Sequence, residues 1–149
     1  MAKFSFRLQS LLNVITQQED NLKNELGKAV QKLEVETRRL SELENASAGY
    51  IAEFNEKAKK TTVHKLIEFN EYLSHLTTKI RQQKENVNHA ALNVDKVREE
   101  LVKAVKERKI LDKFKEKRLE EFNLEQKKLE QKTNDEIVSY KQNVGGAGD

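Results

Sequence analysis

Apolar residues recur along the chain at alternating spacings of three and four, in two separate runs of different length. Such spacing keeps one apolar side of a helix turned toward a partner helix, as in a coiled coil. The first run consists of Leu8, Leu12, Ile15, Leu22, Leu26, Ala29, Leu33, Leu40, Leu43, Tyr50 and Phe54. The second consists of Phe69, Leu73, Leu76, Ile80, Val87, Ala90, Val94, Val97, Leu101, Ala104 and Leu111, and continues more loosely. No proline interrupts either run, so the pattern predicts two long helices.

The pattern predicts an all-α fold, a long antiparallel two-helix coiled-coil hairpin that forms one domain over residues 1–149. Helix one is expected at about 6–57 and the turn at about 58–62. Helix two is expected at about 63–140. The glycine-rich residues after it predict a disordered tail at about 143–149, because glycine disfavours a helix.

The break between the two runs is short and lies between Asn55 and Lys65. A short connection joins helices that run in opposite directions. Thr61 or Thr62 can cap the second helix, because a threonine hydroxyl accepts a hydrogen bond from the first-turn backbone. A turn there places opposite each other residues whose numbers sum to about 120.

The second helix is expected to be the longer one, at about 115 Å against about 75 Å for the first. Residues beyond about 115 would then have no partner within the chain and would form a single-helix overhang. Leu119, Phe122, Leu129 and Ile137 give this overhang a sparse apolar stripe. The stripe is consistent with insertion into a partner, with a solvated extension, or with a homodimer seam.

Three residues interrupt the apolar spacing of the first run: Glu19, Glu36 and Ser47. Gly27 lies inside the same predicted helix and marks either a weak bend or a tolerated exposed glycine.

Composition excludes several classes of function. Asp and Glu (25) nearly balance Lys and Arg (28), so the chain lacks the concentrated positive field of a nucleic-acid binder. The absence of cysteine rules out disulfides and thiol chemistry. Gln9, Ser10 and Asn13 break the apolar stretch that follows the basic start of the chain, and no small-residue cleavage site follows, which argues against a signal peptide. No segment has the ~20 apolar residues of a membrane span, and a cytoplasmic location is expected.

Catalytic and metal-binding patterns are absent from the sequence. His64, His75 and His89 do not have the spacing of helical metal ligands. Glycine-rich phosphate loops and a nucleophile elbow are missing as well. We therefore expect no enzyme activity, no cofactor and no metal.

Three segments resemble the FliJ family, a component of the bacterial flagellar type III export apparatus. They are KFSFRLQSLLNV at 3–14, LIEFNEYLSHLTTKI at 66–80 and KERKILDKFKEKRLEEF at 106–122. The family's coiled coil is similar to the two-helix stalk of the F1-ATPase γ subunit. The resemblance implies binding at the centre of the hexameric export ATPase FliI, contact with the export-gate protein FlhA, and traffic with export chaperones. It also implies a cytoplasmic protein at the periphery of a membrane-embedded gate, without membrane insertion of its own.

The resemblance places the gate-binding face near the turn of the hairpin. The matching positions are Tyr50, Phe54, Tyr72 and Leu76. Lys79 and Gln83 fall where the face would continue, but they differ in type from the residues expected there. Tyr50, Phe54 and Leu76 also belong to the apolar runs, so a role in the core is the alternative for them. Tyr72 lies off the runs and is the best candidate for an exposed anchor.

The overhang supplies the candidate contacts with the ATPase ring. Apolar pore loops could receive Leu119 and Phe122, and acidic rims could receive the basic residues. The candidate residues are Lys113, Lys117, Arg118, Leu119 and Phe122. The expected function is a stalk that couples ATP hydrolysis to protein secretion. The alternative is a generic cytoplasmic coiled-coil adaptor or homodimeric tether.

Overall fold

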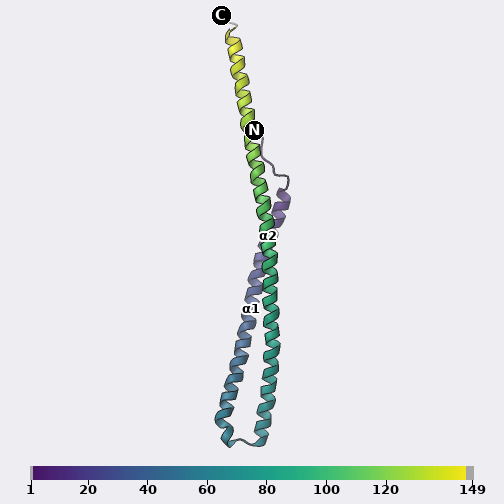
Figure 1. Cartoon of the computed structure of the whole chain (residues 1–149), viewed down its shortest axis with the longest axis vertical. Helices are drawn as coiled ribbons and strands as arrows, with labels where there is room; N and C mark the ends of the chain where they lie inside the picture. Colours follow the sequence, from purple (N-terminus) through teal and green to yellow (C-terminus); the bar gives the residue numbers. More distant parts are fainter. Residues whose placement is uncertain (1, 147–149) are drawn as a thin grey trace. The chain divides into compact units, whose positions relative to one another are not determined.

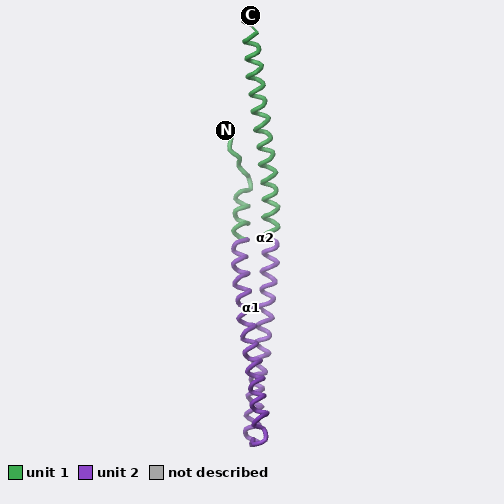
Figure 2. The backbone as a smooth tube through the Cα atoms, turned by 90° about the vertical axis from the view of Figure 1, so that its left-hand side faces the viewer, with its two compact units in different colours: residues 1–18, 104–149 green, residues 19–103 purple. Residues whose placement is uncertain are grey.

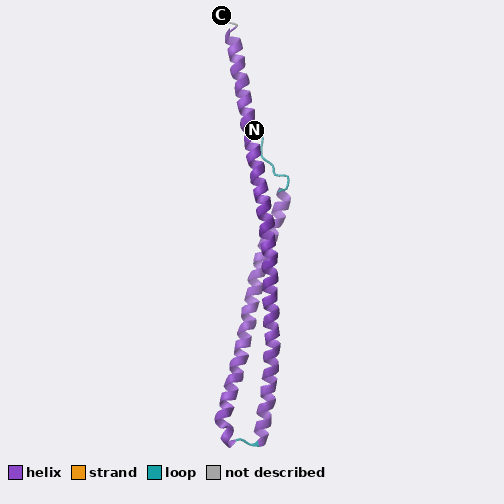
Figure 3. Ribbon diagram, in the orientation of Figure 1, coloured by secondary structure: helices purple, strands orange, loops and turns teal. Residues whose placement is uncertain are grey.

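The computed structural model describes residues 2–146, and every regular element in this range is helical. Helix α1 spans Gln9–Lys57, the short 3₁₀ helix η1 spans Ala58–Lys60, and helix α2 spans Val63–Gly146 (Figures 1 and 3). The predicted all-α class with two long helices is therefore confirmed. The chain divides into two compact units, residues 19–103 (unit 2) and residues 1–18 with 104–149 (unit 1), shown in Figure 2.

Unit 2 is a helical hairpin in which α1 and α2 lie side by side (Figures 1 and 2). Glu36 contacts Gln83, and nearer the turn Tyr50 contacts Phe69. The buried apolar residues of this unit all belong to the two apolar runs: Ala29, Leu76, Ala90, Val94 and Val97. The three-and-four spacing thus identified the side of each helix that forms the core.

Two threonine hydroxyls organise the turn of the hairpin. Thr61 Oγ1 donates a hydrogen bond of 2.8 Å to the carbonyl oxygen of Lys57, at the end of α1. Thr62 Oγ1 accepts a bond of 3.4 Å from the backbone nitrogen of Lys65, in the first turn of α2. Of the two threonines proposed as caps, Thr62 therefore caps the second helix, whereas Thr61 satisfies a carbonyl at the end of the first.

A polar pair interrupts the apolar core of unit 2. Gln83 Nε2 donates hydrogen bonds to the backbone oxygen of Glu36 at 2.8 Å and to its carboxylate Oε2 at 2.5 Å. Arg39 Nη1 lies 3.5 Å from the other oxygen of the same carboxylate. Gln83 is only 7% exposed and lies in the helix interface, so it does not extend an exposed gate-binding face. Its position continues the spacing of the second apolar run, and its amide is buried because Glu36 supplies acceptors for it.

Unit 1 begins with an extended segment instead of a helix. Residues 2–6 have no regular structure, a turn follows, and α1 starts at Gln9, whereas the sequence predicted a start at about residue 6. Phe4, Phe6 and Leu8 alternate with polar residues, and a period of two suits an extended chain that places alternate side chains on one side. We call residues 2–8 the strap.

Helix α2 continues to Gly146, beyond the predicted end at about residue 140. The part of the predicted disordered tail at 143–146 is therefore helical and exposed, and the remainder, 147–149, lies outside the described residues. Extending an existing helix costs far less than starting one, because each added residue gains a hydrogen bond. Gly27 lies within α1 and is exposed, with open space around the position of an added Cβ, which agrees with the tolerated-glycine interpretation.

Candidate functional site

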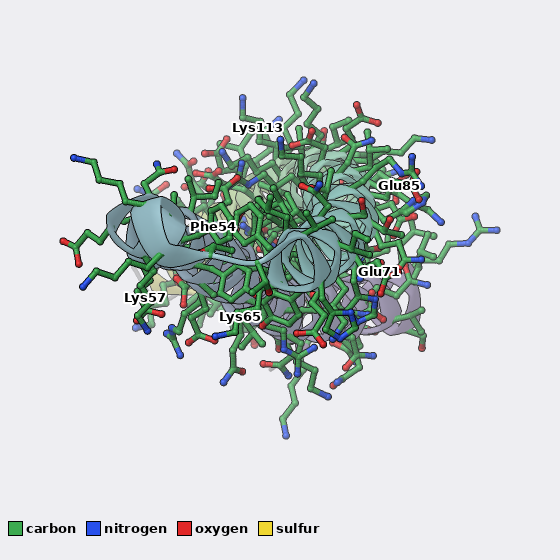
Figure 4. All side chains as sticks on the ribbon, turned by 90° about the horizontal axis from the view of Figure 1, so that it is seen from below. Phe54, Lys57, Lys65, Glu71, Glu85 and Lys113 are labelled. Carbon is green, nitrogen blue, oxygen red and sulfur yellow. The ribbon has the colours of Figure 1, made fainter. Side chains whose placement is uncertain are left out.

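Four aromatic rings gather beside the turn of unit 2, and we call them the tip cluster. Phe54 and Phe69 stack with ring centroids 3.8 Å apart and planes at 15°. Tyr50 stacks on Phe69 at 5.1 Å and meets Tyr72 edge-on at 4.5 Å. Phe69 therefore joins the α1 rings to α2, and Tyr72 extends the cluster toward solvent. Figure 4 looks onto the turn from below and shows Phe54 between the two helices.

The tip cluster borders an open hollow of about 690 Å³ between the two helix ends and the turn. Its apolar wall is formed by Tyr50, Phe54 and Phe69. Its rim carries the lysines Lys57, Lys59, Lys60 and Lys65, together with Glu53, Glu56 and Glu68. An apolar wall with a charged rim is the usual anatomy of a protein-binding surface.

The four residues predicted to bind the gate differ in accessibility. Tyr72 is 45% exposed, Tyr50 and Phe54 are half-buried, and Leu76 is only 5% exposed. Leu76 therefore belongs to the core of the hairpin, the alternative that its place in the apolar run left open. Tyr72 has the exposure that an anchor residue requires, and its binding role stays a prediction.

Sequence reasoning missed Phe69 as a member of this surface. Phe69 opens the second apolar run, so its spacing indicated a core residue only. In the structure it is half-buried and contacts both Tyr50 and Phe54. The available signal was the aromatic composition around the turn: large rings beside a helix end are too bulky for a narrow two-helix seam and remain partly exposed.

A second surface lies in unit 1, where the strap packs along α2. Phe4 packs on Phe122 with ring centroids 5.6 Å apart, and Phe6 packs on Phe114 at 5.8 Å. The guanidinium of Arg118 lies 5.2 Å from the centre of the Phe114 ring, within the range of a cation–π contact. These residues border a hollow of about 580 Å³.

The expectation that residues beyond about 115 lack a partner within the chain is wrong for Phe122, which packs on Phe4. An extended chain advances about 3.3 Å per residue, against about 1.5 Å for a helix. A short extended strap therefore reaches further along α2 than the same residues could as a helix.

The other predicted ring-binding residues of α2, Lys113, Lys117, Arg118 and Leu119, are exposed. Arg118 also lies 3.7 Å from the Glu121 carboxylate, so part of its charge is balanced locally. The structure thus brings Arg118 and Phe122 to the strap and leaves the remaining three candidates on the open surface of α2.

The end of α2 carries no packed neighbour, since every residue from 127 to 146 is exposed. Apolar side chains nevertheless recur here: Leu129, Ile137, Tyr140 and Val144. At 3.6 residues per turn these four residues and Phe122 fall within a sector of about 80° of the helix surface. We call this sector the bare stripe.

Within residues 2–146, no group of three or more His, Asp and Glu side chains is placed to hold a metal ion. None of the helices described has a stretch with the length and hydropathy needed to cross a membrane.

Comparison with protein families gives one match, to the flagellar FliJ protein, over residues 4–145. The match begins in the strap and ends at the last turn of α2, so it includes both surfaces. Searches of curated proteins and of solved structures returned no match. Because the family match extends over nearly the whole sequence, this chain belongs to the flagellar FliJ protein family, whose members are components of the flagellar export apparatus.

Proposed function

We propose that this protein is a stalk that binds the ring of the export ATPase FliI through unit 1 and the export-gate protein FlhA through the tip cluster. It would promote the coupling of ATP hydrolysis to protein secretion mechanically, with no active site of its own. Traffic with export chaperones, and a cytoplasmic location beside the membrane-embedded gate, are parts of the same proposal. The observation that carries it is the bare stripe, a helical apolar surface that no other part of the described chain covers from Leu129 onward.

The hairpin of unit 2 suits a stalk. We propose that its two helices form an antiparallel coiled coil, because buried side chains follow the three-and-four spacing on both of them. Packing of this kind stiffens a helix pair along its length. A stiff element can transmit a displacement, whereas a flexible linker absorbs it.

The ATPase contact rests on the exposed residues of α2 in unit 1. Leu119 is 39% exposed and lies about 60° around the helix from Phe122, so it borders the bare stripe. Lys113 and Lys117 are exposed on the same stretch of helix and can contact acidic groups of a ring. A helix with apolar and basic residues side by side suits a pore that is apolar inside and acidic at its rim.

We expect Leu119→Asp to weaken binding to the purified export ATPase about tenfold, because a carboxylate replaces an apolar contact residue of the interface. Binding is measured by biolayer interferometry, and stimulation of ATP hydrolysis is measured in parallel. Leu124→Asp is the matched control, since Leu124 is exposed on the side of α2 away from Leu119. Equal weakening by both variants, or by neither, would contradict the assignment of this face.

We expect Tyr72→Ala to weaken binding to the cytoplasmic part of FlhA about fivefold, because an exposed aromatic anchor is removed. Binding to the ATPase should stay unchanged. Tyr140→Ala serves as the control, because Tyr140 is an exposed tyrosine of α2 outside the tip cluster. Unchanged FlhA binding by the Tyr72 variant would remove this residue from the site.

The competing proposal is a homodimeric tether, in which the bare stripe of one chain packs on that of a second copy. Analytical ultracentrifugation distinguishes the two functions. A monomer at micromolar concentration supports the stalk. A dimer that dissociates after Leu129→Asp supports the tether.

A further inference from the structure

The strap is held to α2 mainly by aromatic side chains. The Phe4–Phe122 and Phe6–Phe114 ring pairs are its contacts across to the helix, and Phe6 is 8% exposed. Within the described part of the chain, the strap donates and accepts no hydrogen bond with α2. Its backbone bond from Gln9 nitrogen to the Phe6 oxygen, 3.1 Å, stays within its own end of the chain. Figures 1 and 3 show this segment as a loop.

The packing under the strap is incomplete. Phe4 is half-exposed although it contacts Phe122, and Phe114 remains exposed although it contacts both Phe6 and Arg118. The hollow of about 580 Å³ lies among these residues. A segment that is short, loosely packed and without hydrogen bonds to its neighbour opens locally at a lower free energy than a helix core does.

The strap covers the first residue of a longer apolar surface. Phe122 is half-buried beneath Phe4, whereas the next members of the bare stripe, beginning with Leu129, are exposed. A partner that binds the whole stripe must include Phe122, and Phe4 already occupies that position. The strap and the partner therefore require the same face of α2.

We propose that the strap is a displaceable intramolecular ligand that competes with the export ATPase for the Phe114–Phe122 face of α2. The inference rests on the proposed ATPase contact and adds regulation to it. While the strap is bound, only the exposed part of the stripe is available to the ring. Release of Phe4 exposes Phe122 and completes the surface, so the observed affinity depends on the fraction of molecules in which the strap is open.

The competition is tested first by weakening the strap in the full chain. Phe4→Ser removes the ring that covers Phe122 and leaves Phe6 in place. We expect this variant to bind the purified export ATPase at least threefold more tightly than the unaltered protein, because the open fraction rises. Ser5→Ala, an exposed neighbour in the strap, should have no effect. Circular dichroism melting of each variant checks that the helices remain folded.

The reverse test holds the strap closed. The chain contains no cysteine, so Lys3→Cys with Glu125→Cys introduces the only two thiols, one in the strap and one on α2, at positions that line the same hollow. A cleavable bismaleimide that joins them should weaken ATPase binding at least threefold, and reductive cleavage of the linker should restore it. The uncross-linked double variant is the control for the two substitutions.

The outcomes separate the two proposals. If the unaltered protein binds the ATPase and Phe4→Ser binds equally or more weakly, competition by the strap is overturned while the stalk proposal stands. If neither protein binds, the ATPase contact itself is overturned, and the competition with it. If Phe4→Ser binds the ATPase and the unaltered protein does not, the strap blocks the ATPase contact, and the competition is supported. Unchanged binding of the cross-linked protein would also overturn the competition.

Discussion

Gln83→Leu is expected to destabilise the hairpin by about 2–3 kcal/mol, because it removes the donor to a buried carboxylate. Gln83 Nε2 donates to both the side chain and the backbone oxygen of Glu36. Leucine fits the volume of the site but leaves the Glu36 carboxylate in the helix interface with only Arg39 nearby. The cost is measured by urea unfolding followed by circular dichroism, at a concentration where the protein is monomeric.

Two further variants distinguish the cost of leaving the Glu36 carboxylate without its hydrogen-bond donor from the cost of altered packing. Gln82→Leu makes the same chemical change at the exposed neighbouring position and should alter stability by less than about 0.5 kcal/mol. Glu36→Leu combined with Gln83→Leu should recover the stability of the unaltered protein or exceed it, because an apolar pair replaces a buried polar one. A double variant as unstable as Gln83→Leu would show that packing, and not the unpaired carboxylate, causes the loss.

Recovery of stability in the double variant also bears on the role of the polar pair. A buried polar contact in an otherwise apolar seam fixes the register of two helices, because any shift leaves both groups unpaired. We expect the double variant to be at least as stable as the unaltered protein and less restricted in register. Distances between spin labels on α1 and α2 of unit 2 would then have a broader distribution.

Phe69→Ala is expected to destabilise the hairpin by about 2–3 kcal/mol, since it removes a half-buried ring that stacks on two others. Tyr72 contacts Tyr50, and Tyr50 stacks on Phe69, so the exposed anchor loses part of its support. Binding to FlhA should therefore fall along with stability. Urea unfolding and the same binding assay measure the two effects.

Ile67→Ala is the control for the Phe69 variant. Ile67 is exposed two positions away on the same helix, and its truncation should cost less than about 0.5 kcal/mol. Phe69→Leu keeps an apolar side chain without the ring and should restore part of the stability. If Phe69→Ala loses stability and binds FlhA normally, the tip cluster supports the hairpin and takes no part in binding.

The two long helices and their core sides could be predicted from the sequence, because a two-helix core follows the period of the helix itself. Val94 and Val97 are buried for this reason, at positions that the spacing selected. Thr62 was one of the two threonines predicted as a cap, because capping depends on local chemistry. The candidate surfaces were harder to predict. The apolar runs could not tell a buried Leu76 from a half-buried Phe69, since both follow the same spacing.

The sequence by itself determined that there are two long helices, the place of the turn and the apolar side of each helix, because these depend on local spacing and on residue propensity. Tertiary structure decided what covers each position. Gln83 is buried because Glu36 lies across from it in space. Phe122 is partnered because an extended strap, far away in sequence, reaches it. Both contacts depend on how distant segments meet, and the period of a single helix carries no information about its partner.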